Sequence, residues 1–326
     1  MSDARQRTYP LGVRPILADE AARRRLIESR IVEELEGHSF REIILPIIDF
    51  VEPYEEVLAR DVQRRSYRFT DREGDLVSVR SDFTPMIARA IAPTLRPEDL
   101  PMRLFYRGDV IRCEATRLGA TRELFQIGAE LIGLDSLESD VEILTLAARL
   151  LSVAGVRPVV TFSDVRIAER LIDSATGDDD ERHAIRSALS DRRPADLRLS
   201  TTAGASTSEL LRRTATGTAT LDDFASYPPT AEVAERLKAI ALALQSCGEA
   251  EFLATPDDID EAGGYYSGIR FRLFSPQSRV LVAQGGRYDG LYRRFGADTP
   301  ATGFTLTVDH LDAERNDPRS SPERQP

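Results

Sequence analysis

Hydrophobic residues near the start of the chain recur first at helical spacing and then at the alternating spacing of strands. The apolar positions between residues 17 and 37 fall three to four apart, which predicts an amphipathic helix that ends at Gly37. The following stretch, 40–50, is rich in β-formers but contains Pro46. Because proline cannot donate to a strand ladder, we expect an edge or interface strand there.

The next third of the chain predicts a hairpin, a helix and two long strands. Apolar residues alternate on both sides of the polar turn DREGD within 67–79, and Thr84-Pro85 opens a helical pattern that runs to about Ile91. Residues 102–112 and 122–133 then form two β-rich runs. The polar, glycine-containing loop between them favours antiparallel pairing in one sheet.

The second half alternates between helical and strand character. We expect a helix capped by Ser139 or Asp140 that runs to about Val153, and a short strand at 158–162. Residues 164–247 are predominantly helical in pattern, and β character returns between 251 and 308. The order predicts an α+β fold: a mixed antiparallel sheet flanked by helices, interrupted by a helical insertion. We therefore assign 1–163 and 248–312 to one core domain, 164–247 to an inserted helical subdomain, and 313–326 to a disordered tail.

Composition narrows the class of protein. The 326 residues carry a net charge of −11, so a basic surface for nucleic acid is not expected. No apolar run reaches the roughly 18 residues of a membrane span, and no signal peptide is visible, which favours a cytoplasmic protein. The two cysteines and three histidines lack metal-ligand spacing, and no G-x-G-x-x-G follows a strand. We therefore expect neither a metal nor a cofactor.

Strand 122–133 carries the first candidate chemistry. Alternation places Phe125, Ile127, Ala129 and Leu131 on an apolar face that belongs in a core, and Gln126, Gly128 and Glu130 on the other face. An amide and a carboxylate on either side of a glycine gap can hold an ammonium group and a polar ring. The alternative is a solvated sheet face. Arg112, near the end of the partner strand, favours a ligand site because it can clamp a carboxylate or phosphate.

Three further clusters are ambiguous individually. Asp82 and Thr84 precede a helix, where simple N-capping explains them. Tyr265 and Tyr266 follow a glycine pair, which fits either ligand approach or a turn with two core aromatics. Residues 284–291, QGGRYDGL, read as a glycine turn that leads into a helix.

The order and spacing of these segments resemble the catalytic core of histidyl-tRNA synthetase, a class II aminoacyl-tRNA synthetase, over about residues 9–312. YRGDVIRCEATRLGATRELFQIGAELIG looks like the second motif of that family, and VRSDFTP, GGYYSGIRF and GGRYDGL are similar to further family segments. The resemblance implies that residues 17–50 form a dimer interface. It also implies a histidine pocket in which Arg112 faces the carboxylate or α-phosphate region, and whose other members are Asp82, Thr84, Gln126, Glu130, Tyr265 and Tyr266.

Two departures from the synthetase pattern concern ATP. The arginine that helps to activate the carboxylate is replaced by Glu261, and the arginine of the third motif is replaced by His310. A glutamate repels developing negative charge, and a histidine lacks the guanidinium fork, so adenylation is not expected. The anticodon-binding domain that the synthetase needs is not expected either, because only a polar tail follows residue 312.

A chain that keeps the histidine pocket but lacks the residues for adenylation resembles the regulatory subunits of ATP phosphoribosyltransferase. That resemblance implies no catalytic residues, a short-form catalytic subunit as partner, feedback regulation by histidine, a homodimer core and a hetero-octamer. Two alternatives stay open from the residues. One is an enzyme that adenylates an amino acid for an acceptor other than tRNA, and the other is a scaffold whose pocket binds nothing.

Overall fold

The computed structural model describes residues 9–55, 57, 66–113, 121–197, 204–259 and 265–315. Its centre is an eight-stranded sheet in the order β1-β5-β6-β11-β10-β9-β7-β8. The pairings are antiparallel except for those of the two outermost strands, β1 and β8, which run parallel to their neighbours. The strands are β1 (Arg41–Glu42), β5 (Met102–Ile111), β6 (Glu123–Ile132), β7 (Val159–Asp164), β8 (Glu251–Ala254), β9 (Ile269–Phe274), β10 (Leu281–Arg287) and β11 (Ala301–Thr307).

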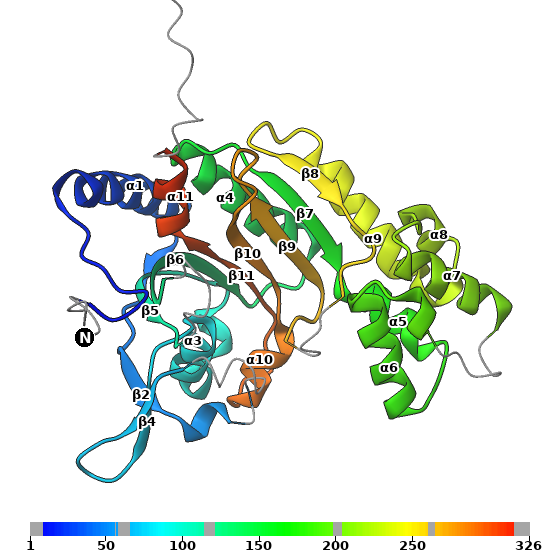
Figure 1. Ribbon diagram of the computed structural model, residues 1–326, viewed down its shortest axis with the longest axis horizontal. Helices are drawn as coiled ribbons and strands as arrows, with labels where there is room; N and C mark the ends of the chain where they lie inside the picture. The colour runs from blue at the N-terminus through cyan, green and yellow to red at the C-terminus, as the bar shows by residue number, and fades with distance from the viewer. Residues whose placement is uncertain are drawn as a thin grey trace, which may run out of the picture.

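Helices cover both faces of this sheet, so the predicted mixed sheet flanked by helices is confirmed (Figure 1). One face packs against α1 (Ala18–Gly37), α4 (Leu137–Val153), α9 (Pro228–Leu244) and α11 (Val308–Arg315). The other face lies under α3 (Thr84–Ile91) and α10 (Asp289–Arg294). The larger apolar core fills the first interface, and two smaller clusters fill the second.

The predicted helix of 17–37 and the helix from Thr84 to Ile91 are both confirmed, and so is the hairpin. The stretch 40–50 splits at Pro46 into β1 and a second short strand, β2 (Ile48–Phe50). Strand β2 joins β3 (Arg68–Thr70) and β4 (Leu76–Val79) in a separate three-stranded antiparallel sheet. Short 3-10 turns occur at Glu52–Tyr54, Ala92–Thr94, Pro97–Asp99 and Pro194–Asp196.

The described residues between β7 and β8 form five α-helices, in line with the helical character that the sequence predicts for this stretch. Four of them, α5 to α8, lie beyond the β7–β8 edge of the sheet, and α9 connects them to α4 (Figure 1). The four are α5 (Val165–Asp173), α6 (Asp179–Ser190), α7 (Ala205–Ala215) and α8 (Leu221–Ala225). We call α5–α9 the helical unit. The domain boundaries at 164 and 247 stay a prediction.

Three expectations need correction. Helix α4 begins at Leu137 with Ser136 as its N-cap, so Ser139 takes the third position of a capping box and Asp140 is no cap at all. Residues 284–287 are not a turn but the end of β10, and α10 follows directly. Helix α11 extends to Arg315, so the start of the predicted tail is helical, and the rest of the tail lies outside the described residues.

Candidate functional site

Strand β6 has two different faces, as its sequence predicts. Ile127, Ala129 and Leu131 are fully buried in the larger core, on the side of α1 and α4. Gln126 and Glu130 point to the opposite side, toward α3 and α10, and are nearly as deeply buried. The strand therefore places a carboxylate in the interior, where a polar group needs a partner.

A cavity of about 60 Å³ opens beside this polar face. It has room for several water molecules. Four of the seven residues that sequence reasoning singled out line it: Asp82, Thr84, Tyr265 and Tyr266. They come from the start of α3 and from the segment before β9, which are far apart in the chain. The fold thus brings two separate sequence clusters to one site.

Glu130 is joined to this cavity through Thr84. The Thr84 hydroxyl donates to Glu130 Oε1 over 2.7 Å, and the Thr84 backbone N–H donates to Asp82 over 3.2 Å. The other carboxylate oxygen, Glu130 Oε2, is buried and has no hydrogen-bond partner among the described residues. A buried acceptor left without a donor is costly, and a bound cation would satisfy it.

The electrostatics of the two carboxyl groups reflect this burial. Burial raises the pKa of Glu130 well above its usual value; the nearby charge of Asp82 adds to the rise, and the Thr84 hydrogen bond opposes it. Burial also raises the pKa of Asp82, and the charge of Arg112 counteracts that effect. Burial and mutual repulsion make it costly for these two neighbouring carboxyl groups to ionise. A positively charged ligand suits the site because its charge would offset both the burial and the repulsion.

The expected gap above Gly128 is absent. A Cβ atom at position 128 would lie 2.2 Å from the hydroxyl oxygen of Tyr106 and 2.5 Å from the Phe304 carbonyl oxygen. Tyr106, directly opposite on β5, is fully buried and fills the space between Gln126 and Glu130. The glycine therefore accommodates a tyrosine ring of the protein itself, and the interpretation of Gly128 as a ligand gap was wrong.

Gln126 and Arg112 lie at the edge of the arrangement. Gln126 pairs in register with Thr307, two residues beyond the cavity-lining Thr305, and it does not line the cavity. Arg112 follows β5, where its Nε donates to the Ser81 carbonyl over 3.4 Å, next to Asp82. The structure thus groups Asp82, Thr84, Glu130 and the two tyrosines closely, and leaves Gln126 and Arg112 around them.

Sequence reasoning missed the wall that β10, Tyr288 and β11 supply. Gly303 lies opposite Glu130 in register, and a Cβ atom there would approach Glu130 Oε2 to 2.0 Å and the Tyr288 hydroxyl to 2.5 Å. Tyr288 lies 5.8 Å from the Tyr265 ring, between ring centroids. The other missed lining residues are Gln284, Gly285, Phe304 and Thr305. The paired glycines before Tyr288 were the available signal, but they were interpreted as a turn.

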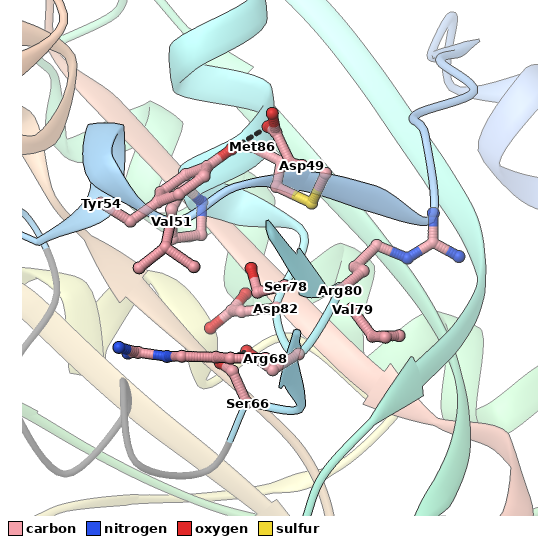
Figure 2. A pocket seen from close by; sticks show the side chains of 12 residues that line it. Asp49, Val51, Tyr54, Ser66, Arg68, Ser78, Val79, Arg80, Asp82 and Met86 are labelled. Atoms are coloured by element: carbon pink, nitrogen blue, oxygen red, sulfur yellow. Dashed lines mark hydrogen bonds between the residues drawn. The ribbon is translucent and has the colours of Figure 1, made fainter. Parts of the chain in front are cut away.

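A second cavity, of about 40 Å³, lies behind Asp82. Figure 2 shows Asp82 and Ser78 at its middle, with Tyr54 and Asp49 at one end and Arg68 with Ser66 at the other. The Tyr54 hydroxyl donates to Asp49 over 2.6 Å. Asp82 lines both cavities, so one side chain separates the candidate site from the space under the β2–β4–β3 sheet.

The residues that replace the ATP-binding motif of the synthetases contact the protein's own backbone. His310 Nδ1 lies 2.8 Å from the Leu281 carbonyl oxygen and donates to it, and Asp309 accepts the Phe125 backbone N–H over 2.6 Å. Glu261 lies outside the described residues. Within the described part of the chain, no cluster of His, Cys, Asp and Glu is arranged to hold a metal ion, and no helix is long and apolar enough to cross a membrane.

Comparison with known proteins identifies the family to which this fold belongs. The histidyl-tRNA synthetase family model matches residues 12–311. The ATP phosphoribosyltransferase regulatory subunit of Geobacter sulfurreducens is 34% identical, over 92% of this chain and 71% of that protein. The chain belongs to the family of ATP phosphoribosyltransferase regulatory subunits. The regulatory subunit of Moorella thermoacetica is 31% identical, over 93% of this chain and 80% of that protein.

A solved structure agrees with this family at the level of fold. A Bacillus halodurans protein described as an ATP phosphoribosyltransferase regulatory subunit/histidyl-tRNA synthetase superposes with a TM-score of 0.81. It covers 96% of this chain and 84% of its own, at 24% sequence identity. The sheet and the helices that cover it therefore follow a histidyl-tRNA synthetase-like fold.

Proposed function

We propose that this chain is a non-catalytic regulatory subunit of ATP phosphoribosyltransferase. In this proposal a short-form catalytic subunit requires it for activity in the first step of histidine biosynthesis, in the cytoplasm. It also takes part in feedback inhibition by histidine. Family membership supports the first part, because relatives with this name align over nearly the whole chain.

The observation that carries the ligand assignment is the pair of carboxyl groups at one cavity, of which Glu130 is buried and Asp82 is half-buried. Free histidine has an ammonium group for Asp82 and Glu130, a carboxylate for Arg112, and a ring for the walls of Tyr265 and Tyr266. Thr84 links both carboxyl groups, and Gln126 adds an amide nearby. Histidine is therefore a ligand whose charges and ring match the arrangement.

The absence of catalysis is supported by the residues near β11. Asp309 and His310 stand where the synthetases carry a glutamate and an arginine, and both side chains bind backbone groups. Arg24 lies 3.6 Å from Asp309 between charged atoms and stacks over Phe125 at 4.2 Å. The histidine ring has no guanidinium fork to hold a triphosphate.

Self-association is part of the proposal. Apolar side chains stand exposed on and before the β2–β4–β3 sheet: Ile44 (86% exposed), Ile47 (60%), Ile48 (49%), Phe50 (46%) and Phe69 (42%). Several large apolar side chains exposed on one small sheet and the segment before it are typical of an interface. We propose a homodimer through this surface, and a hetero-octamer with catalytic subunits. Light scattering on the isolated chain should give at least a dimer at micromolar concentration.

Co-expression with a short catalytic subunit tests the function directly. We expect the two chains to co-purify, the catalytic subunit to gain phosphoribosyltransferase activity, and histidine to inhibit the assembly. The isolated chain should bind histidine in a calorimeter and should show no histidine-dependent ATP–pyrophosphate exchange. Exchange at about 1 per second or faster, an ordinary enzyme rate, would instead identify an adenylating enzyme. A chain that activates its partner but binds no histidine would be a scaffold.

A further inference from the structure

Arg287 is a buried arginine whose donors are all engaged by the described residues around it. Its side chain is 3% exposed, and its Nε and Nη2 donate to Asp140 Oδ1 over 3.0 and 2.7 Å. Nη2 also donates to the Ser139 hydroxyl over 2.9 Å. Nη1 donates to the Leu134 carbonyl over 3.0 Å and to Asp289 over 3.2 Å. The guanidinium therefore has one fixed place between β10 and the start of α4.

The backbone at Arg287 holds the tyrosines of the candidate site. The Ser267 N–H donates to the Arg287 carbonyl over 2.7 Å, and the Asp289 N–H donates to the Ser267 hydroxyl over 2.8 Å. Ser267 directly follows Tyr265 and Tyr266, and Tyr288 directly follows Arg287. Movement of Arg287 would therefore shift both tyrosine-bearing segments together.

Asp140 also binds an arginine of the helical unit. Its second oxygen, Oδ2, accepts a hydrogen bond from Arg236 Nη2 over 2.7 Å, and Arg236 lies on α9. The Asp140 side chain is 2% exposed, and that of Arg236 is 23% exposed. One carboxylate thus bridges β10 and α9.

We propose that Asp140 is a positioning residue for the ligand pocket, which holds the tyrosines in place through Arg287 and joins them to the helical unit through Arg236. The proposal rests on the proposed function, since the pocket is the one assigned to histidine. Asp140 does not line the cavity. It acts through the backbone of Arg287, and α9 contributes to the geometry of the pocket by the same path.

Asp140 supplies two of the five hydrogen bonds that hold Arg287, together with a negative charge. Burial acts to lower the pKa of Arg287, and the charge of Asp140 and its hydrogen bonds outweigh that effect, so the pKa lies above its usual value. Asparagine keeps the shape of the side chain but removes the charge, which would leave a buried guanidinium that seeks other partners. The turn that carries Tyr288 would then lose its fixed position.

The experiment compares Asp140→Asn, Arg236→Ala and a matched control, Arg213→Ala. Arg213 forms a bidentate pair with Asp223 at 2.6 and 2.7 Å, within the helical unit and away from α4. Each variant is measured for melting temperature and for histidine affinity by calorimetry. Labelling of the 9 tyrosines with 3-fluorotyrosine adds ¹⁹F resonances, of which those of Tyr265, Tyr266 and Tyr288 are assigned from Tyr→Phe variants.

We expect Asp140→Asn to weaken histidine binding by up to about tenfold, because the variant loses a charged hydrogen bond that positions the pocket without contacting the ligand. It should also shift the three pocket ¹⁹F resonances in the ligand-free protein. Arg236→Ala should weaken binding about threefold, as is typical of a partly exposed pair, with smaller shifts of the same resonances. Arg213→Ala should lower the melting temperature and leave both other measurements unchanged.

Two results would overturn the proposal. One is Asp140→Asn with a lower melting temperature but histidine affinity within twofold of the wild type and unmoved pocket resonances. If Asp140→Asn does not fold, the two arginine variants decide. The second overturning result is that Arg236→Ala and Arg213→Ala have the same histidine affinity and the same pocket resonances. A wild-type chain that binds no histidine contradicts the proposed function alone, because the ¹⁹F shifts of the ligand-free protein still test the positioning role.

Discussion

The two faces of strand β6 are buried to the same extent but are built on opposite principles. Ile127, Ala129 and Leu131 pack into a continuous apolar core against helices. Gln126 and Glu130, on the other face, are 5% and 1% exposed. One strand therefore has its apolar residues against one layer of the fold and an amide and a carboxyl group against the other.

The difference between the faces shows how stability and ligand binding are separated in this fold. Removal of apolar surface from water stabilises the first face at no electrostatic cost. The second face keeps polar atoms that lack partners among the described residues, namely Glu130 Oε2 and the hydroxyls of Tyr288 and Tyr292. Unmet hydrogen-bonding groups destabilise the empty protein and favour a ligand that satisfies them.

The largest expected effect comes from a cavity in the apolar face. Ile127→Ala should lower the free energy of unfolding by about 2–5 kcal/mol, the range for truncation of a fully buried isoleucine. Chemical denaturation measures this loss. Histidine affinity, determined well below the melting temperature, should stay within twofold of the wild type.

Leu242→Ala is the matched control for that truncation. Leu242 lies on α9 and is 67% exposed, so its loss should change the stability by less than about 0.5 kcal/mol. If Ile127→Ala instead weakened histidine binding as strongly as a change on the polar face, the two faces would not be separable.

Glu130→Ala tests the polar face through its effect on histidine binding. The variant would leave the ligand ammonium with one fewer charged partner. We expect a loss of about 1.5–3 kcal/mol, or about 10- to 150-fold in histidine affinity, measured by calorimetry. Thr84, which donates to Glu130 over 2.7 Å, should remain in place at the start of α3.

The same variant locates the inhibitory site in the assembled enzyme. If inhibition acts through this pocket, Glu130→Ala should desensitise the complex to histidine while its activation of the catalytic subunit stays intact, as linkage between two sites requires. Unchanged inhibition would point to a separate site at the subunit interface. The fold assignment would survive that result, but this pocket would be removed from the regulatory mechanism.

Hydrophobic periodicity predicted the helices and strands that have one clearly apolar face. The helix at 18–37, the hairpin and the strands β5 and β6 were predicted because local spacing fixes which side is apolar. Asp82, Thr84 and the tyrosine pair were found as residue clusters, and the resemblance to a known family supplied the expectation that they meet. Spacing alone does not bring the start of α3 to the segment before β9.

The failed predictions depended on register between strands that are distant in sequence. Gly128 accommodates Tyr106 because the two lie opposite each other across β5 and β6, and no local pattern shows which ring fills a glycine position. Asp140 had the spacing of a helix cap, but tertiary packing places it between Arg287 and Arg236. Gly285 was assigned to a turn although β9 and β11 approach it closely on both sides.

The smallest expected effect, taken per unit of pH, is a dependence of the free energy of unfolding on pH. It belongs to the polar face alone. The pKa of Glu130 is raised well above its usual value of 4.5 in the folded chain, and the unfolded chain has the usual value. Below that value both states hold the proton, so Glu130 and a glutamine at this position should be nearly equivalent. As the pH rises, the unfolded chain releases its proton first, and the wild type loses about 1.4 kcal/mol per pH unit relative to Glu130→Gln until the folded carboxyl group ionises. Urea unfolding of both proteins from pH 4.5 upward measures this difference, and parallel curves would show that Glu130 ionises as readily in the fold as in water. Ile127→Ala should show no such divergence from the wild type, since its loss of stability involves no titrating group.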